Sequence, residues 1–329
     1  MTLPGLARLG LLLLLLAAAG CAPVVALPGP AVAAPTIADA GLVAPDGAKL
    51  PLRIWRPDGE QAPKAVVIAL HGFNDYRNFF ASPGAWLAAR GVQSYAYDQR
   101  GFGEAPNRGL WPGERALADD LKAAVHAVRK RHPDVPLFLL GESMGGAVVM
   151  TAMAGPQPPV VDGVILAAPA VWGRASMPWY QTTALWLAVH TLPGGQVTGR
   201  NLGIKPSDNI EMLKALGRDP LVIKQTRVDA VYGLVNLMDQ AMASASSLHT
   251  PALVLYGAND QLIPPAAVRE MTGRLPASQD GRRRVVYYPS GYHMLLRDLQ
   301  GETVWRDILA WMADPTAPLP SGAEEQAAR

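Results

Sequence analysis

Apolar and polar positions follow two different periods along most of the chain. Residues 65–70 and 136–140 are continuous apolar runs with the length of buried strands, whereas residues 114–131 carry apolar side chains at helical spacing. Strands that alternate with helices in this way form a mostly parallel sheet with helices on both faces. The pattern therefore predicts an α/β fold for residues 38–314.

The remaining elements continue the alternation. A half-buried early strand is expected at residues 49–56, after a turn at Asp46-Gly47, and further strands at 92–98, 163–168, 252–256 and 284–288. Helices are expected at 79–90, closed by Gly91, and at 266–275 and 303–312. The Pro- and Ala-rich, then acidic, residues 315–329 are predicted to form a disordered tail.

The apolar run at 136–140 ends in the pentapeptide GESMG at residues 141–145, and small, helix-compatible residues follow. Strand, tight turn and helix are the context of a nucleophile elbow, whose serine is strained and projects its hydroxyl above the sheet. Only small residues fit at Gly141 and Gly145 in such a turn. The motif predicts Ser143 as a nucleophile; the alternative is a glycine-rich turn without a chemical role.

A serine hydroxyl needs an adjacent base, and in this context the partners follow in the order Ser, Asp, His. Asp260 follows the strand at 252–256, and His293 follows the strand at 284–288. Both would lie at the carboxyl edge of the sheet. We predict that His293 acts as general base and then general acid, and that Asp260 orients it. Taken singly, Asp260 could be a turn cap and His293 a helix N-terminal residue.

The oxyanion of an acyl-transfer intermediate needs fixed N–H donors. We assign one donor to the backbone N–H of Met144 and the other to that of Phe73, in the loop HGFN at residues 71–74. His71 is a further candidate base, although a structural role explains it better.

The alternation is interrupted once, between residues 171 and 247. This stretch is rich in Trp and Met and predicts several short helices. Its position after the strand that follows the elbow helix would make it a cap over the site. Most of its apolar side chains are explained by packing, but some would suit an adaptable pocket for acyl chains. Its aspartates are weaker alternatives to Asp260; they are Asp208, Asp219, Asp229 and Asp239.

Composition removes several function classes. The chain has 329 residues, of which 29 are Lys or Arg and 27 Asp or Glu, and no basic block is long enough to suggest nucleic-acid binding. Its single cysteine, Cys21, allows neither a disulfide nor a Cys-ligated metal site. We therefore expect no metal site. The oligomeric state does not follow from the sequence.

The N-terminus has the features of an export signal. Arg8 precedes an apolar run at residues 9–19 that is too short to span a bilayer but fits a signal peptide. The small residues before Cys21 resemble a bacterial lipobox. This resemblance implies a signal peptide at residues 1–20, a lipidated Cys21, a flexible tether at 22–37 and a lipid anchor in the bacterial cell envelope. The alternative is ordinary cleavage that gives a secreted or periplasmic protein.

Four motifs in this order resemble the α/β-hydrolase superfamily: HGF at residues 71–73, DQRGFG at 98–103, GESMGG at 141–146, and GAND at 257–260 with YH at 292–293. They are most similar to the monoacylglycerol lipase and lysophospholipase group, which is often placed with the serine aminopeptidases. The resemblance covers about residues 39–313. It implies a cofactor-free enzyme with a Ser143, Asp260, His293 triad and a cap that holds one acyl chain. Glu142 departs from the His of many members.

The leading interpretation is a serine hydrolase that cleaves esters of single-chain lipids, either monoacylglycerol or lysophospholipid. Within enzymes, the alternatives are a short-chain esterase, an aminopeptidase or a thioesterase. An aminopeptidase would need an acidic group for the substrate amine, and Glu142 or a cap aspartate could supply it. A non-catalytic binding module is disfavoured because Ser, Asp and His are all present.

Overall fold

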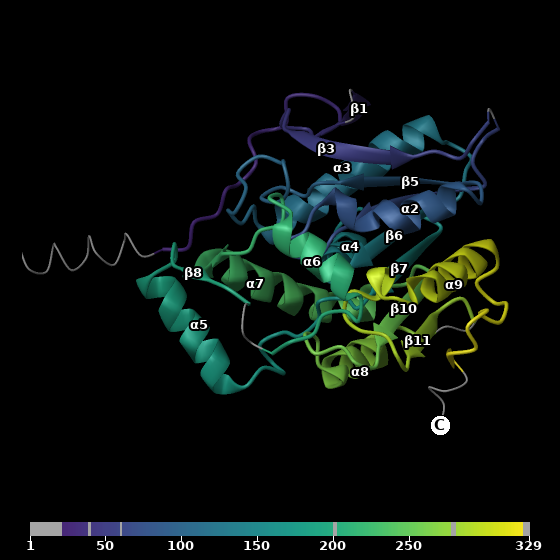
Figure 1. The fold of residues 1–329 in the computed structure, drawn as a ribbon. Helices are drawn as coiled ribbons and strands as arrows, with labels where there is room; N and C mark the ends of the chain where they lie inside the picture. The colour runs from purple at the N-terminus through teal and green to yellow at the C-terminus, as the bar shows by residue number, and fades with distance from the viewer. Residues whose placement is uncertain (1–21, 39–40, 60, 200–202, 278–280, 325–329) are drawn as a thin grey trace, which may run out of the picture.

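The computed structural model describes residues 22–38, 41–59, 61–199, 203–277 and 281–324. A nine-stranded sheet runs through these residues in the order β1-β2-β3-β5-β4-β6-β7-β10-β11 (Figure 1). Neighbours are parallel from β5 to β11, and β1, β2 and β3 extend one edge by antiparallel pairing. The strands are β1 Thr36–Ala38, β2 Gly41–Val43, β3 Lys49–Trp55, β4 Ala65–Leu70, β5 Val92–Tyr97, β6 Leu137–Glu142, β7 Gly163–Ala167, β10 Ala252–Gly257 and β11 Arg284–Tyr288.

Every residue of β4, β6, β7 and β10 is buried, because helices cover both faces of this part of the sheet. One hydrophobic cluster joins the first face to α3 (Glu114–Arg131), α4 (Met144–Ala154) and α8 (Pro265–Arg274). A second cluster joins the other face to α2 (Ala81–Ala88) and α9 (Gly301–Ala313). The predicted parallel sheet between two helical layers is confirmed.

The local predictions are confirmed at some elements and corrected at one. The structure ends α3 and β11 where the sequence pattern ends them. The helix expected at 79–90 is instead a 3₁₀ turn, Arg77–Phe80, followed by α2. Gly91 has φ +89°, the left-handed conformation that closes a helix, and Gly47 at φ +82° turns the β2–β3 hairpin.

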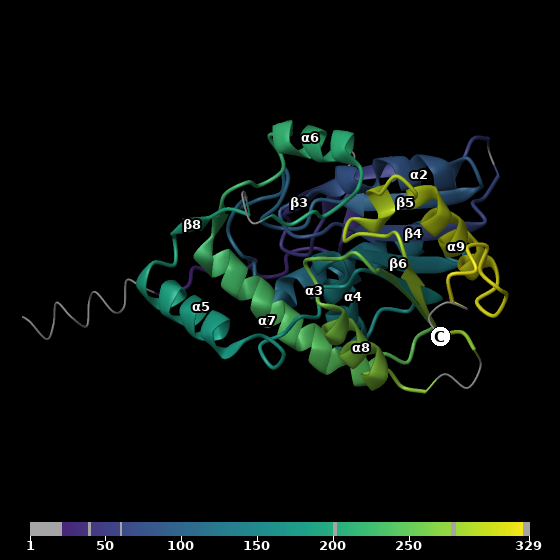
Figure 2. The same cartoon turned by 60° about the horizontal axis from the view of Figure 1, so that its bottom comes forward.

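The segment between β7 and β10 forms the cap. It contains α5 (Trp179–Thr191), β8 (Gln196–Val197), α6 (Ile210–Arg218), β9 (Thr226–Arg227) and α7 (Val228–Ser244). Figures 1 and 2 show α7 between α5 and the core, where α7 packs on α4. No helix in the described ranges combines the length and hydrophobicity that crossing a bilayer requires.

The predicted tether is not free over its described length. The N–H of Ala26 donates to the Trp111 carbonyl over 2.8 Å, and the N–H of Val24 donates to Oδ2 of Asp229 over 3.2 Å. Residues 36–38 form β1. Backbone pairing needs no apolar periodicity, so this packing left no signal in the sequence. Cys21 and the predicted signal peptide lie outside the described residues.

The predicted disordered tail also needs correction as far as residue 324. Leu319 and Ala323 are buried, and Arg284 forms an ion pair with Glu324. The N–H of Ser321 donates to Oδ1 of Asp307 on α9 over 2.9 Å. Two apolar side chains and one ion pair are too few to stand out in a Pro-rich stretch, yet they hold this segment against the sheet edge.

Candidate active site

Ser143 occupies the turn between β6 and α4 with φ 52° and ψ −114°, a conformation that residues with a side chain rarely adopt. The backbone around this turn is closely packed. A Cβ added to Gly141 would lie 2.4 Å from the carbonyl carbon of Gly145, and a Cβ on Gly145 would lie 2.3 Å from the Leu70 carbonyl oxygen. The predicted strand, tight turn and helix are therefore present, and both glycines are required by contact.

Asp260 and His293 come from the loops after β10 and β11, which touch each other closely. A Cβ on Gly257 would lie 2.4 Å from the carbonyl carbon of Gly291, so a side chain there would push the loops apart. The N–H of Asn259 donates to the Gly291 carbonyl over 2.9 Å. This contact brings the carboxylate of one loop beside the imidazole of the other.

The three predicted side chains form one hydrogen-bonded series. Nδ1 of His293 lies 2.8 Å from Oδ2 of Asp260, and Nε2 lies 2.9 Å from Oγ of Ser143. Oδ1 of Asp260 accepts the N–H groups of Leu262 and Ile263 over 2.7 and 3.0 Å. The carboxylate is thus fixed from behind, and it favours the tautomer with a proton on Nδ1. That tautomer leaves Nε2 free to accept the hydroxyl proton.

The two assigned N–H donors belong to segments next to Ser143. Met144 is the first residue of α4, where backbone N–H groups lack partners within the helix. Phe73 belongs to the loop after β4, and a Cβ on its neighbour Gly72 would lie 3.4 Å from Cβ of Ser143. The loop therefore passes directly beside the nucleophile, as the oxyanion assignment requires.

His71 is held as a structural residue. It is fully buried; its Nδ1 lies 2.8 Å from the Gly72 carbonyl, and its Nε2 accepts the N–H of Gln99 over 3.0 Å. Burial lowers the pKa of His71, which keeps the ring neutral. Because both nitrogens are engaged, His71 fixes the loop that carries Phe73 and is not available as a base.

A pocket of about 480 Å³ opens above Ser143 and His293. The cap supplies much of its wall through apolar side chains, among them Trp172, Met177, Leu234 and Met238. Other large cap residues are exposed and do not line the pocket; they are Trp179, Tyr180 and Trp186. The structure thus separates the cap side chains that the sequence could not sort.

The polar wall of the pocket contains a buried charge cluster that the sequence did not reveal. Arg297 pairs with Asp75 over 2.8 Å and with Glu142 over 2.9 Å. Burial raises the pKa of the Glu142 carboxyl, and Arg297 opposes this rise. The only hint in the sequence was Glu142 itself, a charged residue beside the nucleophile in an apolar strand.

The cap aspartates named as weaker acids have other partners. Asp219 accepts the Tyr76 hydroxyl over 2.6 Å, and Asp229 pairs with Arg227 over 2.6 Å. Asp239 pairs with Arg174, and Asp208 accepts the N–H of Leu299 over 2.8 Å. None of these four lines the pocket over Ser143 in the described chain. Asp260 is the carboxylate that the fold delivers to His293.

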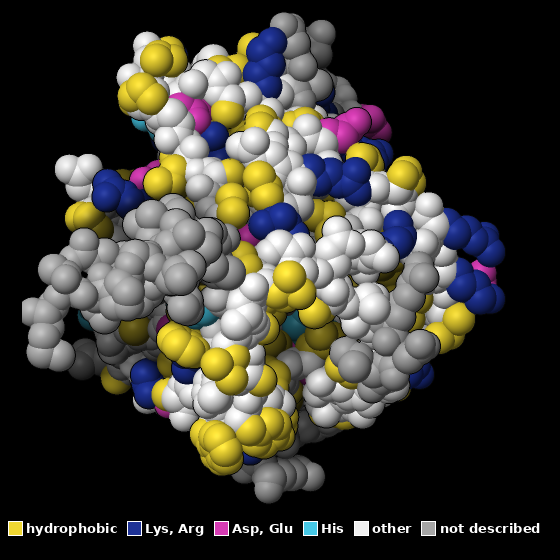
Figure 3. Space-filling model, turned by 90° about the vertical axis from the view of Figure 1, so that its left-hand side faces the viewer, with side chains coloured by type: hydrophobic (Ala, Val, Ile, Leu, Met, Phe, Trp, Pro, Cys, Tyr) yellow, Lys and Arg dark blue, Asp and Glu magenta, His cyan; other side chains and the backbone are white. Residues whose placement is uncertain are grey.

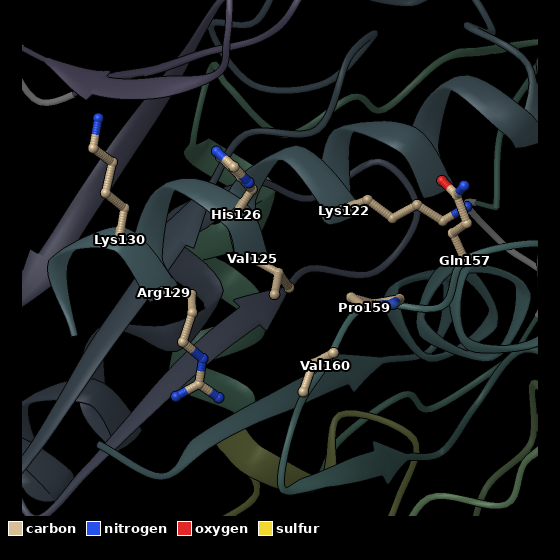
Figure 4. A pocket seen from close by; sticks show the side chains of 8 residues that line it. All are labelled: Lys122, Val125, His126, Arg129, Lys130, Gln157, Pro159 and Val160. Atoms are coloured by element: carbon tan, nitrogen blue, oxygen red, sulfur yellow. The ribbon is translucent and has the colours of Figure 1, made fainter. Parts of the chain in front are cut away.

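A larger hollow of about 700 Å³ lies elsewhere, between α3 and the loop after α4. Figure 4 shows its side chains, which include Lys122, His126, Arg129 and Lys130. It contains no serine or cysteine nucleophile and no carboxylate among its lining residues. Likewise, among the described residues no group of His, Cys, Asp and Glu is arranged to hold a metal ion. The chemistry therefore belongs to the pocket over Ser143.

A mostly parallel sheet, a strained serine after β6, and an acid and a histidine after β10 and β11 define the α/β-hydrolase class. The family model for serine aminopeptidase, S33, matches residues 61–300, and the chain belongs to this family.

Two relatives that the chain resembles in sequence are monoacylglycerol or monoglyceride lipases. The chain is 26% identical over 278 residues to a monoacylglycerol lipase of Mycolicibacterium smegmatis, covering 81% of this chain and 93% of that protein. It is 28% identical over 293 residues to the monoglyceride lipase of Homo sapiens, covering 84% and 90%.

Solved structures share the fold. The monoacylglycerol lipase of Paleococcus ferrophilus superposes with a TM-score of 0.67 at 21% identity, covering 81% of this chain and 99% of that one. A soluble variant of the Saccharomyces cerevisiae monoglyceride lipase, in complex with a substrate analog, gives a TM-score of 0.68 at 19% identity, covering 90% and 99%.

Proposed function

We propose that this protein is a serine hydrolase that cleaves the carboxylic ester bond of single-chain lipids, monoacylglycerol or lysophospholipid, through an acyl-enzyme. The observation that carries the proposal is the series Ser143–His293–Asp260 at the floor of a pocket whose cap side is apolar. The named relatives, which are monoacylglycerol lipases, support the same substrate class.

This arrangement supports ester cleavage in two steps, acylation of Ser143 and hydrolysis of the acyl-enzyme. Ser143 Oγ attacks the ester carbonyl while Nε2 of His293 takes the hydroxyl proton, and the imidazolium is stabilised by Asp260. The tetrahedral oxyanion lies at the N–H groups of Met144 and Phe73, each worth about 10²–10³ in rate. The proton on Nε2 then passes to the leaving alkoxide. A water molecule, deprotonated by His293, attacks the acyl-enzyme; the bond between the acyl carbon and Ser143 Oγ breaks, Oγ takes the proton back from Nε2, and the fatty acid is released.

The pocket favours a lipid over a peptide. Its cap side is apolar, which suits one acyl chain. A free amino group would need a carboxylate to pair with, and the two carboxylates lining this pocket, Asp75 and Glu142, already pair with Arg297. This arrangement disfavours the aminopeptidase that the family description would otherwise suggest.

The test is hydrolysis by the purified chain from residue 22 onward beside its Ser143→Ala variant. Substrates are p-nitrophenyl esters from acetyl to palmitoyl, monoacylglycerol, lysophosphatidylcholine and an aminoacyl anilide. We expect turnover that needs Ser143 and is highest with medium or long acyl chains. Preference for the anilide would replace the lipase by a peptidase. Absence of any turnover that needs Ser143 would remove the catalytic proposal.

We further infer that the protein is anchored to a membrane of the bacterial cell envelope through a lipidated Cys21. The small residues before Cys21 and the apolar run at 9–19 support this. The first described residues lie beside the end of α5, because Asp229 accepts the N–H of Val24 and donates its own N–H to the Pro193 carbonyl. An anchor at Cys21 would therefore act on the α5 side of the cap.

Helix α5 on that side exposes large apolar side chains. Helix α5 contains no Asp, Glu, Lys or Arg, and Trp179 is 78% and Trp186 53% exposed. Figure 3 faces this side and shows hydrophobic side chains gathered on it. The anchor is tested by fractionating cells that express the full chain or its Cys21→Ala variant. We expect the wild type in membranes with a diacylglycerol adduct on its N-terminal peptide, and a soluble wild type would contradict the anchor.

A further inference from the structure

We propose that Arg297 is a positioning residue that ties together the three loops on which the proposed chemistry depends. Arg297 ends the short helix Leu295–Arg297, four residues beyond His293 in the chain. Its Nη1 lies 2.8 Å from Oδ2 of Asp75, and its Nη2 lies 2.9 Å from Oε2 of Glu142. One guanidinium therefore joins the loop of the acid–base histidine to two others.

The two carboxylates lie next to the other reacting groups. Asp75 follows the oxyanion donor Phe73 by two residues, and Glu142 directly precedes Ser143. Oδ1 of Asp75 also accepts the N–H of Tyr76 over 2.8 Å, which fixes this carboxylate to its own loop. A displacement of Arg297 would consequently shift the nucleophile, the base and the oxyanion donor at the same time.

Burial makes these contacts strong. The side chains of Arg297, Asp75 and Glu142 are 9%, 8% and 2% exposed, so water screens their charges only weakly. Removal of one member leaves uncompensated charge in the interior. Arginine suits the position because its planar fork reaches two carboxylates at fixed directions, which the single ammonium of lysine does not do.

The cluster also sets the charge around His293. The charged groups in this part of the pocket come from the loops after β10 and β4, from the end of β6 and from the helix at 295–297; they are Asp260, Asp75, Glu142 and Arg297. Asp298, which is buried and accepts the N–H of Tyr292 next to His293, adds one more carboxylate that none of the variants changes. Loss of the Arg297 cation leaves excess negative charge, which favours the imidazolium. Loss of the Glu142 charge has the opposite effect, since a negative neighbour disappears.

The inference rests on the proposed function, and the experiment compares Arg297→Met, Arg297→Lys and Glu142→Gln by kcat, KM and the pH profile on a soluble p-nitrophenyl ester. For Arg297→Met we expect kcat to fall about 10²-fold from misplaced groups, with KM changed less than about 3-fold. The acid limb of its pH–rate profile moves to higher pH, and the Arg297→Lys variant regains part of the lost kcat. For Glu142→Gln the acid limb moves to lower pH.

Arg100→Met is the matched control. Arg100 is also buried and also joins two carboxylates, Asp46 over 2.7 Å and Asp120 over 2.6 Å, but on the β2–β3 hairpin and α3. We expect Arg100→Met to lose about as much thermal stability as Arg297→Met. Its kcat per folded molecule and the acid limb of its pH–rate profile should stay as in the wild type. If Arg297→Met fails to fold, Glu142→Gln, which keeps the Asp75–Arg297 pair, still tests the proposal through its acid limb.

The outcomes separate the inference from the function. If wild-type turnover needs Ser143 but a folded Arg297→Met protein keeps its kcat and acid limb, Arg297 is merely structural and the hydrolase stands. If both variants shift the acid limb in the same direction, the charge argument is wrong. If the wild type shows no turnover that needs Ser143 and a fluorophosphonate does not label Ser143, the hydrolase and this inference both fail.

Discussion

The floor of the pocket and the outer cap helix α5 use their side chains in opposite ways. At the floor, Asp260 and His293 are each 7% exposed, and every partner distance in their series is between 2.7 and 3.0 Å. On α5 only Val189 is buried, and the large aromatic residues face outward. The floor is fixed by contacts from several loops at once, whereas α5 is held mainly through α7. The catalytic side chains thus lie in the region that several loops hold in place, and the exposed helix α5 contributes no residue to the pocket lining among the described residues.

The largest effect should come from the floor. Asp260→Asn removes the carboxylate that selects the tautomer of His293, and we expect kcat to fall about 10⁴-fold with little change in fold. Asp298→Asn is the control, because Asp298 is equally buried in the same region and accepts the Tyr292 N–H over 2.7 Å and the Ser207 hydroxyl over 2.6 Å. Steady-state kinetics measure kcat for both variants, and an equal loss of kcat in Asp260→Asn and Asp298→Asn would contradict the role of Asp260.

The floor was also the part that sequence could predict. Ser143 and Asp260 each follow a buried strand and His293 follows the partly buried edge strand β11, and strand periodicity with local turn chemistry was enough to place them at one edge. The Arg297 cluster was not predicted, because it joins residues from three loops whose approach depends on tertiary packing. Packing of residues 24–26 and 319–323 was missed for the same reason, since each segment contributes only a few contacts.

The next effect should come from the inner cap. Leu234 lines the pocket from α7, and Leu234→Trp would fill space that an acyl chain occupies. We expect palmitoyl ester turnover to fall by about 10–200-fold, the range for small size changes in apolar pockets, with acetyl ester turnover nearly unchanged. Leu262→Ala, at the pocket edge outside the cap, is the comparison. Equal loss on both esters would mean that this wall does not hold the chain.

A smaller effect should come from the outer cap. Trp179→Ser with Trp186→Ser removes exposed apolar surface from α5, and we expect turnover of monoacylglycerol in anionic vesicles to fall on the order of 10-fold. Turnover of a soluble acetyl ester should stay the same, because neither side chain lines the pocket over Ser143. An equal loss on both substrates would show that α5 supports the fold and not the contact with lipid.

The smallest effect concerns stability of the floor. Burial raises the pKa of the Glu142 carboxyl, so the folded protein holds this proton more tightly than the unfolded chain. The resulting stabilisation is present at low pH and is lost as pH rises through the folded pKa. Glu142→Gln cannot titrate, so its free energy of unfolding relative to wild type should rise as pH increases above the ordinary range of a glutamate carboxyl.

Urea unfolding at several pH values measures this difference, and Glu302→Gln provides the control. Glu302 is an exposed α9 residue whose pKa is lowered by its hydrogen bond to Arg306, so its contribution changes only at lower pH. The Glu302→Gln difference should be flat over the same range. If the difference in free energy of unfolding between Glu142→Gln and wild type is also independent of pH, Arg297 fully compensates the charge of Glu142. The titration of Glu142 would then contribute nothing to the stability of the pocket floor.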